Sequence, residues 1–442
     1  MSDWLSMTMA DLGRDIEGGA IDPRDLTAAY LDAIEAHEHK DRIYARTTRP
    51  RAEAEAAAGS ERAKAGLRRG PLDGIPISWK DLFDTAGIAT EAGSKLLEGR
   101  TPDTDAEVLK NATYQGLVCL GKTHMSELAF SGLGLNPSTG TPPCINDASA
   151  VAGGSSSGAA ASVAFGLAPC GIGSDTAGSV RIPAAWNDLV GLKTTAGRVS
   201  LSGVVDLCAR FDTVGPLCRT VEDAALMLAA LEGRQPADLA GTSLKGRRLA
   251  VLETVACDDL REAPKAAFDS ALARLQAQGA ELHHIEAPEA EEALSLAPVL
   301  FAGEAYGRWH KEIEAAPEKM FGEIRERFRG GKDFSAPEFV SAWIRLDALR
   351  RTWQARFAGF DAVLTPTAAN LPPDAERLMS DSSYYIEENL LALRNTRIGN
   401  LMGLSAVTLP TGTPSCGLQL LGAPFGEERL LRIASAAEAA LS

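Results

Sequence analysis

Short apolar runs alternate with segments of helical periodicity from residue 71 onward, and this alternation constrains the fold more than any other feature of the sequence. Strands that alternate with helices favour an α/β fold. We therefore predict a mixed, twisted central sheet that helices cover in an α/β/α sandwich. The apolar runs occupy residues 75–80, 117–120, 167–172, 249–252, 362–364 and 417–421.

The flanking segments carry helical patterns. Before the first apolar run, Asp22 is typical of a helix cap and Pro23 of a first helical turn. Residues 304–357 are rich in Arg, Glu and Trp at helical spacing, which predicts a helical cover over the sheet or over a pocket mouth. We predict one domain over residues 1–442, made of N-terminal helices (1–66), a core (67–240) and the second half of that core with its helical cover (241–442).

The charge balance argues against two classes of partner. With 59 acidic and 44 basic side chains the net charge is -15, so nucleic acid and anionic membranes are repelled on average. No stretch approaches the roughly 18 apolar residues of a membrane span, and Met1–Trp4 does not begin a secretion signal. Seven cysteines without a C-x-x-C pair fit reduced thiols better than a zinc site. These features predict a cytoplasmic protein without a metal.

Two serine-bearing glycine loops stand close together in the sequence. Residues 153–158 read G-G-S-S-S-G and lead directly into an alanine-rich segment. Such a loop can expose backbone N–H groups at the start of a helix, although an isolated match is equally typical of a flexible turn. The second loop, residues 173–183, contains Ser179. The pair suggests serine chemistry, with Ser155 or Ser179 as the reactive group.

A serine hydroxyl attacks a carbonyl group poorly unless a base takes its proton. None of the six histidines lies in a sequence context that is typical of a catalytic base. Lysine can act instead when burial lowers its pKa, because desolvation disfavours the ammonium form. Lys80 ends the apolar run 75–80, where a solvated lysine is not expected, and it is the preferred candidate. The histidines are His37, His39, His124, His283, His284 and His310.

The segments around Lys80, Ser155 and Ser179 together resemble the amidase signature family. Residues 71–84 read P-L-D-G-I-P-I-S-W-K-D-L-F-D, and a nearly continuous block of resemblance covers residues 153–200. Further resemblance covers residues 121–127 and, more weakly, segments from 212 to 424, so it spans most of the chain.

The resemblance implies a catalytic triad and a chemistry. Ser179 would be the nucleophile, Ser155 a proton relay on a cis peptide after Gly154, and neutral Lys80 the base. The family more often has glycine at the position of Ala177. The added methyl group can affect the loop and the width of the pocket, so the resemblance leaves open which substrate shape is accepted. The implied activity is hydrolysis of a small-molecule amide through an acyl-enzyme. The oxyanion hole would comprise the N–H groups of Thr176, Ala177, Gly178 and Ser179.

The same resemblance implies supporting residues around the triad. Asp175 and Arg181 would support the nucleophile loop, and Ser174 would support the triad or contact substrate. No cofactor is implied, and a homodimer is compatible with the resemblance. Variable segments, residues 138–150 and 304–343, are expected to line the pocket. The predicted substrate-binding residues are Met125, Ser126, Gly154 and Ser174.

Three alternatives stay open at this point. The first is the amidase-like glutaminase component of a tRNA-dependent amidotransferase, which would have the same triad. The second is a serine esterase of the α/β-hydrolase type, because residues 154–158 come close to G-x-S-x-G, but a loop-borne histidine would be needed. The third is a catalytically dead binding protein, against which the presence of all three triad residues argues.

Overall fold

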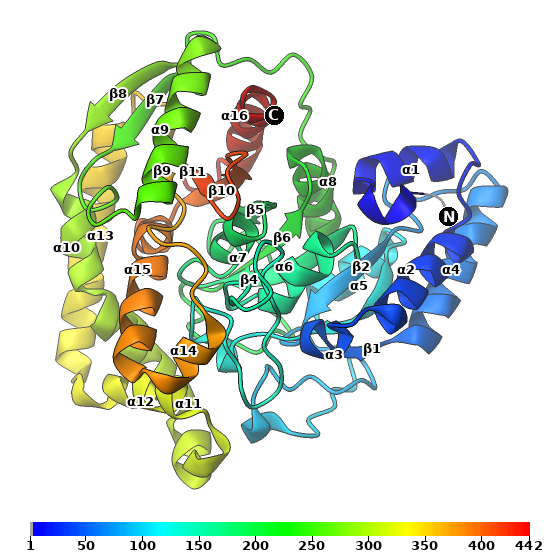
Figure 1. Cartoon of the computed structure of the whole chain (residues 1–442), viewed down its shortest axis with the longest axis horizontal. Helices are drawn as coiled ribbons and strands as arrows, with labels where there is room; N and C mark the ends of the chain where they lie inside the picture. The colour runs from blue at the N-terminus through cyan, green and yellow to red at the C-terminus, as the bar shows by residue number, and fades with distance from the viewer. Residues whose placement is uncertain (1–2) are drawn as a thin grey trace.

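In the part of the chain that the structure describes, eleven strands form one mixed sheet in the order β1-β3-β2-β4-β6-β5-β10-β11-β9-β7-β8 (Figure 1). The computed structural model describes residues 3–442, so the interpretation of the start of the chain at Met1 and Ser2 lies outside the described residues. The sheet confirms the predicted α/β class. The strands are β1 (Tyr44–Thr47), β2 (Pro76–Lys80), β3 (Val118–Thr123), β4 (Cys170–Asp175), β5 (Val190–Lys193), β6 (Thr213–Cys218), β7 (Arg248–Leu252), β8 (Glu281–Ile285), β9 (Ala362–Pro366), β10 (Ser405–Pro410) and β11 (Gly417–Gly422).

Strand direction changes along the sheet, and the change sets the position of the candidate site. β2 pairs in parallel with β3 on one side and with β4 on the other. From β4 through β6, β5, β10 and β11 to β9 all pairs are antiparallel, and β9, β7 and β8 are again parallel. Because β2 and β4 run in the same direction, Lys80 at the end of β2 and Asp175 at the end of β4 lie at one edge of the sheet.

Helices cover the sheet, and in Figure 1 the N-terminal helices lie at the opposite end of the molecule from α13 and α15. Asp22 caps α2 by accepting a hydrogen bond from the Arg24 amide, as predicted. The helices are α1 (Met9–Glu17), α2 (Pro23–Ala36), α3 (Lys40–Ile43), α4 (Arg49–Lys64), α5 (Glu107–Tyr114), α6 (Ser157–Ala164), α7 (Arg181–Trp186), α8 (Val221–Glu232), α9 (Glu262–Ala277), α10 (Pro288–Ser295), α11 (Gly303–Ala315), α12 (Gly322–Arg329), α13 (Ala336–Phe357), α14 (Ala375–Ser380), α15 (Ser382–Leu401) and α16 (Glu427–Leu441).

Some details differ from the sequence-based expectation. Residues 1–66 contain the strand β1, which pairs antiparallel with β3 and was not predicted. The run expected at residues 167–172 starts later, because β4 begins at Cys170. Residues 304–357 are helical as predicted, in α11, α12 and α13. The proposed division of a single domain at residues 66 and 240 stays a prediction. Within residues 3–442 no helix has the length and apolar character needed to cross a membrane.

Candidate active site

Lys80 lies at the centre of a cluster of serine hydroxyls. Its side chain is fully buried at the end of β2. The Nζ atom donates hydrogen bonds to the Oγ atoms of Ser155 at 2.7 Å, Ser174 at 2.8 Å and Ser156 at 3.1 Å. Three acceptors match the three donors of an ammonium group. The structure therefore brings two of the three expected triad residues into direct contact.

Burial controls the protonation of Lys80. Desolvation lowers the pKa of its ammonium group to about 7, although the nearby carboxylates of Asp212 and Asp175 act in the opposite direction. A lysine with that pKa populates both the ammonium form and the neutral amine near pH 7. The environment therefore supplies the neutral amine that a lysine base requires.

The loop that carries Ser155 is held by close backbone contacts. The peptide bond between Gly154 and Ser155 is cis, as the resemblance implied. The Ser126 amide donates to the Ser155 carbonyl at 3.1 Å, and the Gly154 amide donates to the Gly132 carbonyl at 2.8 Å. A Cβ atom on Gly154 would lie 2.5 Å from both the Gly134 nitrogen and Ser126 Oγ, so only glycine fits.

Of the residues predicted to bind substrate, Ser126 and Gly154 therefore lie against Ser155. Met125 precedes Ser126 and is fully buried, and its carbonyl accepts a hydrogen bond from Asn136 at 2.8 Å. Ser174 is buried and holds Lys80. These contacts place Ser174 beside Lys80, and Met125 beside Asn136 and next to Ser126 in the chain.

Asp175 organises the loop that carries Ser179. One carboxylate oxygen accepts from the Gly178 amide at 2.8 Å, and the other accepts from the Val180 amide at 3.2 Å. The Arg181 guanidinium donates to the same carboxylate from Nε at 2.9 Å and from Nη2 at 2.8 Å, and both side chains are fully buried. Burial alone would raise the pKa of Asp175, but Arg181 holds it well below the usual range.

The two serine loops are joined directly. The Ser156 amide donates to the Ser179 carbonyl at 3.2 Å, and Ser179 itself is buried. The Ser156 hydroxyl also donates to the Ser174 carbonyl at 3.2 Å. The sequence pattern did not single out Ser156, although its place in the G-G-S-S-S-G stretch was a usable signal.

The backbone donors expected in the oxyanion hole are not equivalent. The Gly178 amide is engaged by Asp175. Within residues 3–442, the amides of Thr176, Ala177 and Ser179 have no hydrogen-bond acceptor. Three donors therefore remain available for an anionic oxygen, and we leave Gly178 out of the proposed hole.

Long-range contacts complete the loop, and no local sequence signal indicated them. The Thr176 hydroxyl donates to Asp212, whose pKa burial raises to about 6. The Thr396 hydroxyl donates to the Ala177 carbonyl at 2.7 Å. Arg181 also donates to the Thr396 carbonyl at 2.7 Å and to Asn400. Residues far apart in the chain therefore fix the shape of the nucleophile loop.

A family model described as Amidase matches residues 25–431, which is most of the chain. The chain belongs to the amidase family. It is therefore an amidase, a hydrolase that acts on C–N bonds.

The similarity of this chain to individual amidase-family proteins extends over nearly the full length of both chains. It is 35% identical to 2-amino-5-chloromuconic acid deaminase of Comamonas testosteroni, covering 94% of this chain and 93% of that protein. It is 32% identical to a glutamyl-tRNA(Gln) amidotransferase subunit of Anaeromyxobacter sp. strain K, covering 97% of this chain and 95% of that protein. A solved structure of a vestigial protein complex, described as revealing the origins of an s-triazine catabolic enzyme, matches with a TM-score of 0.90 at 28% identity, covering 98% of both chains.

Among the histidines of this amidase, His124 contacts the segment that follows Ser155 through its backbone, because its carbonyl accepts from the Gly158 amide at 2.9 Å. Within residues 3–442 no histidine side chain forms a hydrogen bond with Ser155 or Ser179. His124 is buried, which lowers its pKa to about 4. His283 and His284 lie on the edge strand β8. The esterase alternative, which needs a histidine base, has no support from these positions.

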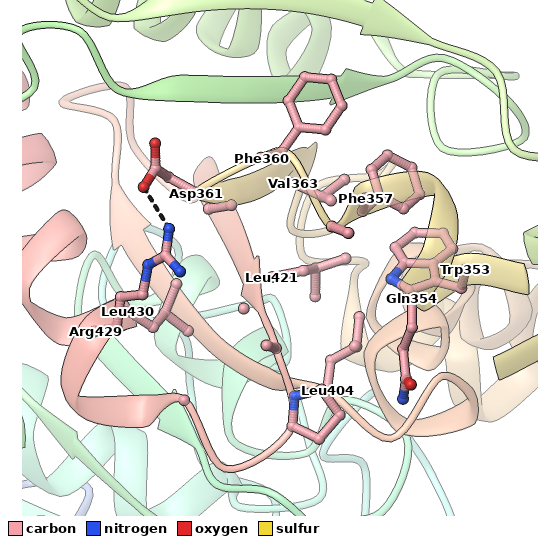
Figure 2. A pocket seen from close by; sticks show the side chains of 16 residues that line it. Trp353, Gln354, Phe357, Phe360, Asp361, Val363, Leu404, Leu421, Arg429 and Leu430 are labelled. Atoms are coloured by element: carbon pink, nitrogen blue, oxygen red, sulfur yellow. Dashed lines mark hydrogen bonds and ion pairs between the residues drawn. The ribbon is translucent and has the colours of Figure 1, made fainter. Parts of the chain in front are cut away.

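A cavity of about 410 Å³ lies between the end of α13, β9 and the start of α16 (Figure 2). No triad residue lines it. Its charged groups neutralise each other, because Arg429 donates to Asp361 at 2.7 Å, as the dashed line shows. The hydroxyl cluster around Lys80, and not this cavity, is the candidate active site of the amidase.

Proposed function

We propose that this amidase hydrolyses the amide bond of a small molecule through an acyl-enzyme on Ser179, with Ser155 as proton relay and Lys80 as base. The observation that carries the proposal is the 2.7 Å hydrogen bond between Lys80 Nζ and Ser155 Oγ in a fully buried site. The lowered pKa of Lys80 supports its role as a neutral base.

The proposed steps move one proton through the relay in each direction. Lys80 takes the Ser155 proton while Ser155 takes the Ser179 proton, and Ser179 Oγ bonds to the substrate carbonyl carbon. Free backbone amides of Thr176, Ala177 and Ser179 stabilise the resulting oxyanion. The proton returns through Ser155 to the leaving nitrogen, so the C–N bond breaks and an ester remains on Ser179. Water, deprotonated by the same relay, then hydrolyses the ester.

Release of ammonia or amine from a panel of small amides tests this proposal. We expect Ser179→Ala and Lys80→Ala each to lower kcat by about 10³-fold or more, because the nucleophile and its base act as a unit. Ser295→Ala and Lys332→Ala replace exposed residues and serve as matched controls with unchanged rates. Activity that survives Ser179→Ala would refute the assignment of the nucleophile.

A second candidate function is that of the glutaminase component of a tRNA-dependent amidotransferase. The 32% identity to an amidotransferase subunit over 97% of this chain favours it. Under this proposal the protein would copurify with partner proteins from its native cell and would hydrolyse glutamine only in their presence. Hydrolysis of a small amide by the isolated chain, without glutaminase activity, would exclude it.

A further inference from the structure

A second cavity, which we call the arginine pocket, also has a volume of about 410 Å³. Residues from α12, from α15 and from the segment Pro298–Ala302 line it, together with Phe130. The Ser382 hydroxyl at the start of α15 donates to Glu323 on α12, so the two helices are in contact at this place. Figure 1 places α12 and α15 at the end of the molecule opposite α1.

Two arginines line this pocket without a counter-ion. Within residues 3–442, neither the Arg327 nor the Arg397 side chain forms an ion pair or a hydrogen bond, and the Nε atom of Arg397 is buried without a partner. Arg327 instead lies 4.6 Å from the ring centroid of Phe130. Burial and, to a smaller extent, the neighbouring charge of Arg327 lower the pKa of Arg397 to about 9.

The carboxylates that line the pocket are engaged elsewhere. Glu326 is paired with Arg325 at 2.8 Å and with Arg329 at 3.1 Å. Glu323 accepts the hydrogen bond from Ser382. Neither carboxylate forms an ion pair with Arg327 or Arg397 among the described residues, so the two guanidinium groups share the cavity without a directly bound counter-ion.

Two like charges in one partly buried cavity are unfavourable until an anion joins them. The planar guanidinium group matches the two oxygens of a carboxylate, to which it donates parallel hydrogen bonds. The apolar lining from the buried side chains of Phe130 and Phe301 would strengthen those bonds by excluding water from that side of the pocket. The pocket thus has the chemistry of a carboxylate site with room for a carbon chain.

Helix α15, which lines the pocket, is connected to both serine loops, directly to one and through Gly132 to the other. Thr396, the residue before Arg397, donates to the Ala177 carbonyl at 2.7 Å in the nucleophile loop. Asn389, which lines the pocket, accepts from the Gly132 amide at 2.9 Å. The Gly132 carbonyl in turn accepts from the Gly154 amide at 2.8 Å, next to Ser155. No triad residue lines the arginine pocket either, but these contacts of α15 connect it to the reaction centre, and among the described residues no such hydrogen bond links the first cavity to it.

We propose that Arg327 and Arg397 bind a carboxylate of the substrate, so that the amide attacked by Ser179 belongs to a monoamide of a dicarboxylic acid. This inference rests on the proposed function and specifies its substrate class. It assigns the two arginines to substrate binding and not to the proton relay.

Kinetics with matched substrates test the assignment. Ammonia release is compared between monoamides of C3–C6 dicarboxylic acids and the methyl esters of the same compounds, which lack the negative charge. We expect the wild type to prefer the acids, and Arg327→Met and Arg397→Met each to lower kcat/KM for the acids by about 10- to 100-fold, since hydrogen bonds to charged groups are lost. Rates with the esters should not change. Arg351→Gln removes one exposed charge on α13, outside the pocket, and should leave the rates with the acids and with the esters unchanged.

A binding measurement separates this inference from the catalytic proposal. C3–C6 dicarboxylates are titrated calorimetrically into the full-length Ser179→Ala variant, which needs no turnover. We expect one dicarboxylate to bind at one site, and binding to be lost in the Ser179→Ala/Arg397→Met double variant but kept in the Ser179→Ala/Arg351→Gln double variant. The inference would be overturned if no dicarboxylate binds, or if binding survives Arg397→Met. It would also be overturned if inorganic phosphate binds as tightly as the dicarboxylate. Activity that survives Ser179→Ala would overturn only the catalytic proposal.

Discussion

The ammonium nitrogen of Lys80 lies 2.7 Å from the hydroxyl oxygen of Ser155, and this contact links the end of β2 to the loop that precedes α6. Two further hydroxyls, from Ser174 and Ser156, complete the surroundings of the nitrogen. Because the group is fully buried, its protonation is governed by the protein and not by solvent. The ionisation of Lys80 is therefore the most direct link between structure and activity.

The pH dependence of the rate follows from this ionisation. Burial lowers the pKa of Lys80 to about 7, and the proposed base must be neutral. We expect kcat/KM to rise with pH through about 7 and to level off above it, in a profile measured between pH 5.5 and 9 with an uncharged amide. A rate that falls over this range would contradict a neutral lysine base.

The same ionisation predicts how stability changes with pH. The pKa of Lys80 is lower in the folded state, so between pH 7 and about 10 the unfolded chain binds more protons at this residue. The contribution of Lys80 to the free energy of unfolding should therefore increase as pH rises across that range. Urea unfolding of wild type and Lys80→Met at pH 7 and pH 9 measures this contribution. Between pH 7 and pH 9 the free energy of unfolding should increase more for the wild type than for Lys80→Met. An equal change in the two proteins would argue against the lowered pKa of Lys80.

Asp175 should be essential for stability as well as for loop shape. Asp175→Asn removes the only carboxylate that pairs with Arg181 among the described residues, and it leaves a fully buried guanidinium without an anion. Loss of one partner of a buried pair typically costs about 3–5 kcal/mol. The free energy of unfolding in urea measures this cost. Asp269→Asn, which breaks the exposed pair with Lys265, is the control and should change it little. A small effect of Asp175→Asn would indicate that the neighbouring amides and Asn400 suffice for Arg181.

Gly178 should tolerate no side chain. Its φ of 137° is rare for other residues, and an added Cβ would lie 2.1 Å from Thr396 Oγ1. We expect Gly178→Ala to destabilise the protein by roughly 1–3 kcal/mol and to abolish most amidase activity by moving the nucleophile loop. Gly197→Ala is a matched control, because Gly197 also has a positive φ of 83° but faces open space. Thermal unfolding and kcat for the two variants distinguish collision from backbone strain, and equal losses would contradict a role for the Thr396 contact.

Arg397→Met should make the protein more stable while weakening substrate binding. The substitution replaces a partly buried charge that lacks a counter-ion with an apolar side chain of similar length. We expect the thermal midpoint to rise without ligand, as measured by calorimetry. Arg181→Met should lower it, because that guanidinium is fully paired. A lower midpoint for Arg397→Met would show that the charge stabilises the free protein.

The strands most clearly predictable from the sequence are those with continuous apolar runs. β2 and β9 are buried along their whole length, and continuous apolar patterns marked both. β5 has only four residues, β6 contains Pro216 near its centre, and β1 reads Y-A-R-T without an apolar run. These strands form because neighbouring strands in the sheet provide hydrogen-bond partners. The local sequence pattern does not reveal which strands those neighbours are.

The candidate site likewise contains residues that the sequence predicts and residues that it does not. Lys80, Ser155 and Ser179 could be predicted because glycine loops and an apolar strand mark them in the sequence. Asp212 and Thr396 reach the nucleophile loop from distant parts of the chain, and nothing in their local sequence indicates the contact. An arginine on a helix, such as Arg327 or Arg397, has the same sequence pattern whether it faces solvent or a cavity.

The reaction centre and the arginine pocket come from different stretches of the polypeptide. Lys80, Ser155 and Ser179 lie within one stretch, whereas all residues that line the pocket except Phe130 lie between Ala297 and Arg397. Under the proposed assignment, substitutions at lining positions other than Asn389 would change which acid is accepted without altering the groups that break the bond. Evolution toward a new substrate would then require few substitutions. A laboratory library limited to the lining positions of α12 and α15 would sample new specificities, provided that Thr396 and Asn400 of α15, which contact the nucleophile loop, are kept.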